Sequence, residues 1–208
     1  MPDANPSVVI IDDDPEFRES VERLLESVGL DTQQFSSVAD FLKAAPSDGP
    51  TCLVLDVRMP GRSGLELQRD LAAANRLLPI IFITAHADIP MTVQAMKGGA
   101  LEFLTKPFRD QDLLDAVEAG LDRDRARREI DTALGALRER FDTLSTRERQ
   151  IMIQVTAGRL NKQISSDMGI AESTVKVHRT NLMRKMKARS LPELGRMAEA
   201  LKLAAEKH

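Results

Sequence analysis

The stretch Ser7–Asp14, with the sequence SVVIIDDD, points to the fold most directly, because a short apolar run ends abruptly in three carboxylates. Two further apolar runs that end in a polar residue are CLVLD at Cys52–Asp56 and IIFIT at Ile80–Thr84. Strands that are apolar on both faces are typical of a parallel sheet covered by helices on each side. Weaker runs at Thr32–Phe35 and Leu101–Leu104 complete a set of five predicted strands.

Amphipathic segments alternate with these runs. Phe17, Val21 and Leu24 follow the spacing of one helical face, and Gly29 is placed to end that helix. Five strand–helix units predict an α/β fold over residues 1–122, an open, doubly wound sheet of five parallel strands of the flavodoxin-like type. Right-handed crossovers would place a ligand site at the carboxyl ends of the strands.

The composition is that of a globular protein, with 42% hydrophobic and 29% charged residues, and no apolar run is long enough for a membrane span. The N-terminus lacks the pattern of a secretory signal, and the single cysteine, Cys52, lies in an apolar run, so we expect a reduced thiol and a cytoplasmic location. Residues 1–142 carry a net charge of −10 and residues 143–208 one of +7. This asymmetry predicts two domains, of which the basic one binds nucleic acid.

The segment 123–142 is rich in charge and contains no proline, which predicts a helical linker. A short heptad-like stripe runs through and just beyond it, formed by Ile130, Leu134, Leu137, Phe141 and Leu144. The stripe has two interpretations: the helix lies on its own protein, or it pairs with the same helix of a second copy.

Residues 143–208 have a purely helical pattern and predict a small all-α domain of four helices. Ser145 and Glu148 form a capping box at the first helix. Three further helices are expected, with breaks at Gly158 and Gly169, over Lys162–Met168, Glu172–Lys187 and Pro192–Ala204. The second and third of the four helices have the form of a helix-turn-helix.

Acidic residues stand where two of the predicted strands end, with Asp12, Asp13 and Asp14 after the first and Asp56 at the end of the third. Neighbouring carboxylates repel one another unless a cation neutralises them, and Mg²⁺, with Mn²⁺ as a possible substitute, suits such a ligand set. Asp56 is placed to act as a nucleophile toward phosphorus. Two further groups at strand ends, the hydroxyl of Thr84 and the ammonium of Lys106, would contact a phosphoryl group.

These elements resemble, in order and spacing, the receiver domain of two-component response regulators over about residues 6–122. The matching residues are Asp12-Asp13, Asp56 with Met59-Pro60-Gly61, Thr84-Ala85 and Lys106-Pro107-Phe108. The resemblance implies that Asp56 is the phospho-acceptor, and that Asp12, Asp13, Asp56 and the backbone carbonyl of Arg58 bind the metal. It also implies that Phe103 is the aromatic switch residue. The segment 84–97 resembles the FixJ subgroup, in which phosphorylation promotes dimerisation of the receiver.

The C-terminal part resembles the LuxR/NarL-type effector domain over about residues 143–208, through Leu144-Ser145, Arg147-Glu148-Arg149, Asn161-Lys162, Ile164 and Thr174–His178. The expected DNA contacts are Lys162, Thr174, Lys176, Val177, Arg179 and Thr180. The last helix carries an apolar stripe that fits either core packing or effector dimerisation, formed by Leu191, Leu194, Met197 and Leu201. The sequence departs from the family at Ala171, where a serine or threonine usually caps the recognition helix.

The two resemblances together imply a response regulator that accepts a phosphoryl group from a sensor histidine kinase, dimerises, binds promoter DNA and acts with RNA polymerase, most often as an activator. It would not be an enzyme beyond its own magnesium-dependent phosphorylation. One alternative is a magnesium-dependent phosphatase of the haloacid dehalogenase type, but Arg58 stands where such enzymes carry a second carboxylate. The other is a receiver whose C-terminal helices bind a protein instead of DNA.

Overall fold

The computed structural model describes residues 5–45 and 47–205, and its contacts divide the chain into two compact units after Arg128. The first unit contains a five-stranded parallel sheet in the order β2-β1-β3-β4-β5. The strands are β1 (Ser7–Ile11), β2 (Asp31–Phe35), β3 (Thr51–Asp56), β4 (Ile80–Thr84) and β5 (Glu102–Thr105). The fold class expected from the sequence is therefore confirmed.

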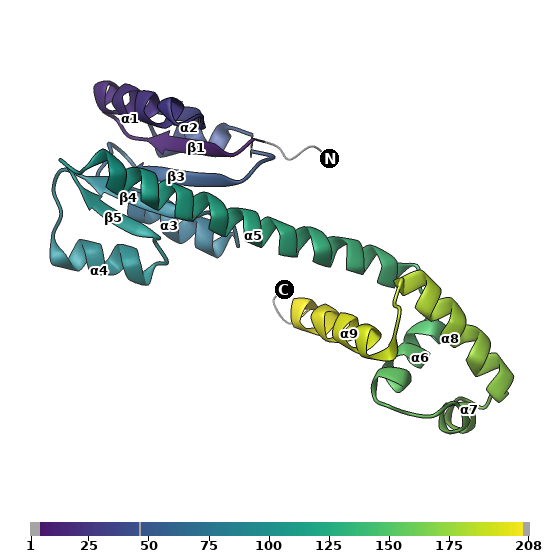
Figure 1. Cartoon of the computed structure of the whole chain (residues 1–208). Helices are drawn as coiled ribbons and strands as arrows, with labels where there is room; N and C mark the ends of the chain where they lie inside the picture. Colours follow the sequence, from purple (N-terminus) through teal and green to yellow (C-terminus); the bar gives the residue numbers. More distant parts are fainter. Residues whose placement is uncertain (1–4, 46, 206–208) are drawn as a thin grey trace. The chain divides into compact units, whose positions relative to one another are not determined.

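Helices cover both faces of this sheet (Figure 1), and they are α1 (Pro15–Ser27), α2 (Val38–Lys43), α3 (Gly64–Ala73), α4 (Ile89–Lys97) and α5 (Asp110–Asp142). Alternate strand residues face opposite sides: Val9 and Ile11 join the core under α2, α3 and α4, whereas Val8 and Ile10 join the core under α1 and α5. Burial on both faces explains why the strands read as continuous apolar runs.

The helix α5 is a single element of 33 residues, so the segment predicted as a linker is the second part of a longer helix. Asp124 on this helix is fully buried, and its carboxylate accepts a hydrogen bond from the backbone N–H of Thr51 at 2.9 Å. Arg127 and Arg128 also donate to Asp124. These contacts attach α5 to the start of β3. The first unit therefore extends to Arg128, and the division between the units lies inside the predicted linker 123–142.

The second unit comprises the end of α5 together with α6 (Thr146–Thr156), α7 (Asn161–Met168), α8 (Glu172–Met186) and α9 (Leu191–Ala205). Leu137 and Leu144, from the heptad-like stripe, are buried in its core, whereas Ile130 is 61% exposed. The C-terminal part of the stripe therefore packs on its own domain, which favours that interpretation over pairing with the same helix of a second copy. Among the described residues, no helix is long and apolar enough to span a membrane.

Candidate phosphoryl site and DNA-binding surface

Three carboxylates meet at the carboxyl edge of the sheet. β1 and β3 are neighbours, with Ile11 paired to Leu55, so the residues that follow them come together. Asp12, Asp13 and Asp56 each offer a carboxylate oxygen, and these oxygens lie within 4.8 Å of one another. Asp12 is buried, Asp56 is half-buried and Asp13 is exposed, so the cluster opens to solvent on one side.

Lys106 provides the positive charge of this cluster. Its Nζ lies 2.7 Å from Oδ2 of Asp12 and 3.8 Å from Oδ2 of Asp56. The same Nζ lies 3.4 Å from the ring centroid of Phe17 on α1, a cation–π contact that holds the side chain over the site. The Lys106 ammonium is therefore shared between two acidic groups, one of which is the predicted acceptor.

Burial raises the pKa of Asp56, and the nearby Asp12 carboxylate raises it further. The backbone N–H of Arg58, which donates to Oδ1 of Asp56 at 2.9 Å, and the Lys106 ammonium act in the opposite direction. A bound cation would stabilise the negatively charged form of this carboxyl group, which burial and the Asp12 carboxylate disfavour. Asp12, Asp13 and Asp56 supply the hard oxygen donors that Mg²⁺ prefers, so the residues present fit this ion.

The three consecutive aspartates have different roles in the structure. Asp14 is the N-cap of α1, and its Oδ1 accepts from the backbone N–H groups of Glu16 and Phe17 at 3.0 and 3.3 Å. Asp12 accepts from the backbone N–H of Asp14 at 2.9 Å. The capping role of Asp14 leaves Asp12 and Asp13 as the two members of the triplet in the cluster.

The other predicted phosphoryl and switch residues, Thr84 and Phe103, lie on β4 and β5, which pair with Thr84 opposite Thr105 and Phe82 opposite Phe103. Thr84 is buried, and its hydroxyl accepts from the backbone N–H of His86 at 3.3 Å. Phe103 is half-buried, with its ring centroid 6.3 Å from that of Phe82. The hydroxyl and the aromatic ring thus lie on adjacent strands.

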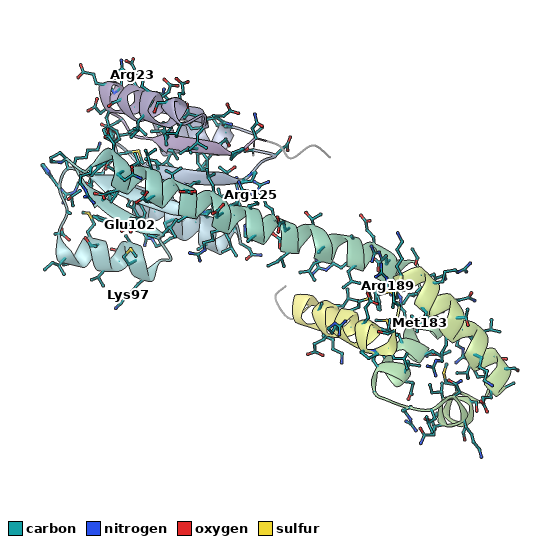
Figure 2. All side chains as sticks on the ribbon, viewed as in Figure 1. Arg23, Lys97, Glu102, Arg125, Met183 and Arg189 are labelled. Carbon is teal, nitrogen blue, oxygen red and sulfur yellow. The ribbon has the colours of Figure 1, made fainter. Side chains whose placement is uncertain are left out.

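An exposed apolar face lies on α4. Ile89, Val93 and Met96 are 81%, 44% and 44% exposed, and they follow one another at intervals of about one helical turn. The helix begins at the N-cap Asp88 and ends at Lys97, whose side chain projects away from the sheet (Figure 2). Such a row of apolar side chains is a candidate contact surface.

In the second unit, α8 presents most of the predicted DNA contacts to solvent. Thr174, Lys176 and Thr180 are exposed, and Val177 is 59% exposed. The opposite face of α8 is buried through Val175, Leu182 and Met186. Lys162, on α7, is exposed as well. A helix with one buried and one open, partly basic face has the form required to enter a major groove.

Arg179 differs from its neighbours, because it is half-buried and its guanidinium donates to Oδ1 of Asn161 at the start of α7. It therefore links the two helices of the helix-turn-helix, a role that the sequence analysis did not assign to Asn161. No local sequence pattern relates Arg179 to Asn161, since 18 positions separate them. Ala171 is the N-cap of α8 and makes no side-chain hydrogen bond there, because alanine has no side-chain acceptor.

The predicted dimerisation stripe on α9 divides by burial. Leu194 is fully buried in the core of the second unit, so its side chain supports the domain rather than an exposed contact surface. Met197 and Leu201 are half-buried against the same core, and Leu191 is 43% exposed. Of the four residues, Leu191 is the one most available for a contact.

Two protein families match this chain, one in each of its two units. Residues 8–118 match the family described as response regulator receiver domain, and residues 142–198 match the family described as bacterial regulatory proteins, luxR family. Nodulation protein W of Bradyrhizobium diazoefficiens is 52% identical over 95% of this chain and 87% of its own length. The transcriptional regulatory protein FixJ of Azorhizobium caulinodans is 47% identical over 95% of this chain and 93% of its own. The solved structure of the response regulator StyR is 48% identical and covers 94% of this chain and 99% of its own, with a TM-score of 0.86.

Proposed function

This chain belongs to the response regulators, with a receiver domain followed by a LuxR-type DNA-binding domain, and on that premise we propose that phosphorylation of Asp56 controls its binding to promoter DNA. The observation that carries the proposal is the cluster of Asp12, Asp13 and Asp56 with the Lys106 ammonium in contact with two of them. This arrangement is suited to holding a small, highly charged group.

In the proposed reaction, a carboxylate oxygen of Asp56 attacks phosphorus, and the bond between phosphorus and the donor breaks. The donor is the phosphohistidine of a sensor kinase or a small phosphorylated molecule. Bound Mg²⁺, held by Asp12, Asp13, Asp56 and the carbonyl of Arg58, would offset the charge of the transferred group. Lys106 keeps its ammonium beside the acceptor, because the Asp12 carboxylate and the Phe17 ring hold it there.

The product stays on the protein, which separates this function from that of a phosphatase. Arg58 occupies the position two residues after Asp56 where the haloacid dehalogenase type carries an acid. We therefore expect Asp56 to act once per activation event, with no steady release of phosphate from phosphomonoesters.

We further propose that the phosphoryl group biases a two-state equilibrium of the receiver. The Thr84 hydroxyl, now an acceptor for the N–H of His86, would turn to donate to a phosphoryl oxygen, and Phe103 would move toward the space that it leaves. The exposed face of α4 would then pair with that of a second receiver. A dimer presents two copies of α8, as a two-part operator requires.

The outcome in the cell would be regulation of transcription, most often activation, by a cytoplasmic protein whose partners are a sensor kinase, promoter DNA and RNA polymerase. FixJ, a relative at 47% identity, is described as a transcriptional regulatory protein. The charge of the C-terminal part, +7 over residues 143–208, supports DNA as its ligand.

The proposal is tested by measuring dimer formation and binding to promoter fragments with and without acetyl phosphate and Mg²⁺, in wild type and in Asp56→Asn. Wild type should dimerise and bind more tightly when the donor is present. The Asp56→Asn variant should show neither response. A variant that still responds to acetyl phosphate would show that the acceptor is another residue.

A further inference from the structure

The second unit contains an apolar groove that takes no part in the proposed reading of DNA. Its volume is about 410 Å³, and it lies between the end of α5, α6 and α9. The floor is formed by Phe141, Met152, Ile153, Ala198 and Leu201. None of its lining residues belongs to α7 or α8, so an occupied groove leaves the helix-turn-helix free.

Ile153 is the most informative residue of this groove. It is 68% exposed, although its neighbours on α6, Ile151 and Met152, are buried in the core. An exposed apolar side chain that continues an apolar groove is typical of a surface that a partner covers. The hydroxyl of Thr156, which also lines the groove, donates to the backbone carbonyl of Met152 at 2.9 Å, so the floor offers a partner little hydrogen bonding.

The charged residues that line the groove are all cations, namely Arg138, Arg149 and Lys202, and no acidic side chain is among the described residues that line it. Arg149 lies with its guanidinium carbon 4.7 Å from the centroid of the Phe141 ring, and its Nη2 lies 3.5 Å from Oδ1 of Asp142, an exposed residue that does not line the groove. An apolar centre with a basic rim is complementary to an apolar stripe flanked by acidic groups.

These features of the groove discriminate among three possible occupants. A symmetric second copy would bring two sets of the same cations together, which costs free energy. DNA phosphates would gain nothing from an apolar floor. An amphipathic helix gives apolar side chains one turn apart for the floor and carboxylates for the rim.

We propose that the groove between α5, α6 and α9 is a docking site for an acidic amphipathic helix of a partner protein. The apolar anchors of that helix would cover Ile153 and contact Phe141 and Leu201, and its acidic residues would lie against Lys202 and Arg149. The interaction needs neither phosphorylation nor DNA.

The test uses the full-length protein and two fluorescently labelled synthetic helical peptides with identical leucines at positions i, i+3, i+4 and i+7. One peptide carries glutamate and the other lysine at the flanking positions. Fluorescence anisotropy should show binding of the glutamate peptide and at least about tenfold weaker binding of the lysine peptide. Lys202→Glu should reduce this preference.

Ile153→Glu should weaken binding of the glutamate peptide at least about tenfold while DNA binding stays unchanged. Leu160→Glu is the matched control, because Leu160 is also 68% exposed but lies outside the groove, and it should leave peptide binding unchanged. Circular dichroism of each variant checks that the domain is folded.

The proposal is overturned if the glutamate peptide does not bind, if both peptides bind equally, or if Ile153→Glu binds as wild type does. Self-association that Ile153→Glu abolishes, without peptide binding, would assign the groove to a second copy. Binding of decanoate that Ile153→Glu abolishes, again without peptide binding, would assign it to a small amphiphile.

Discussion

The acidic pocket of the receiver and the DNA-facing side of α8 differ in how far the protein itself completes them. In the pocket, Asp12 is buried, and Lys106 already contacts both Asp12 and Asp56. On α8, Lys176 and Val177 are exposed, and the Lys176 Nζ lies 3.5 Å from Glu172 in a surface ion pair. A phosphoryl group and a metal ion are small and need donors fixed in advance, whereas DNA is large and supplies much of the contact itself.

Substitutions should therefore act differently in the two regions. In the pocket, Lys106 contacts both Asp12 and Asp56, so removal of one charged side chain changes the interactions of the others. A single substitution there should therefore affect the whole site. On α8, each exposed side chain should contribute separately, with an effect limited to its own contact.

Asp13→Asn should lower the affinity for Mg²⁺ by roughly ten- to a hundredfold, because it removes one of three carboxylates from the cluster. The measurement is the Mg²⁺ concentration that gives half-maximal phosphorylation by acetyl phosphate. Asp14→Asn is the control, because asparagine also caps a helix and Asp14 caps α1. A similar loss in both variants would contradict the separate roles of the two aspartates.

Asp124→Asn should destabilise the receiver by about 1.5 kcal/mol at neutral pH, because it removes a buried carboxylate that accepts charged hydrogen bonds from Arg127 and Arg128. Asp122→Asn is the control, since Asp122 is 65% exposed in a surface pair with Arg125, and it should change stability by less than about 0.5 kcal/mol. Urea unfolding gives the stability, and hydrogen exchange identifies the receiver transition.

The same residue predicts a pH dependence. Burial alone would raise the pKa of Asp124, but the hydrogen bonds from Arg127, Arg128 and the Thr51 N–H hold this pKa below its ordinary value of 3.8. Because the pKa is lower in the folded state, the carboxylate stabilises the fold above about pH 4, and this stabilisation is lost as the pH falls through the folded-state pKa. The difference in stability between wild type and Asp124→Asn should therefore shrink from about pH 5 to pH 3. A constant difference would rule out this origin.

Lys176→Ala should weaken binding to all DNA sequences about fivefold at moderate salt and reduce the slope of log K against log salt by about one unit, if its ammonium meets a phosphate. Val177→Ala should instead lose about 1 kcal/mol at one base pair, because a methyl group reads a thymine. Titrations at several salt concentrations with a set of single-base operator variants measure both effects. A sequence-specific loss for Lys176→Ala would assign it to base reading.

Ala171→Ser should stabilise the second unit by about 0.5–1 kcal/mol, because α8 begins without a side-chain cap. Ser145→Ala should have the opposite effect of similar size, since Ser145 caps α6 by accepting from the N–H of Glu148 at 3.3 Å. Thermal unfolding followed by circular dichroism measures both. If Ala171→Ser had no effect, the start of α8 would be satisfied without a side-chain cap.

Local patterns in the sequence determined the elements of this protein and the candidate residues of its pocket. Continuous apolar runs identified strands buried on both faces, and the residues that follow them were predictable as site residues because parallel strands end at one edge. The Ser145–Glu148 capping box was equally readable, because its hydrogen bonds join residues three positions apart.

Only the tertiary structure decided which side chains share a contact. Lys106 and Asp12 are 94 positions apart, and Asp124 and Thr51 are 73 apart, so no local pattern relates them. In the sequence, Asp124 is one of many charged residues in its segment, and Leu194 belongs to a stripe that fits either core packing or dimerisation, whereas the structure buries both fully. Burial and pairing depend on what the rest of the chain brings to a position, which a residue's own neighbours in sequence do not specify.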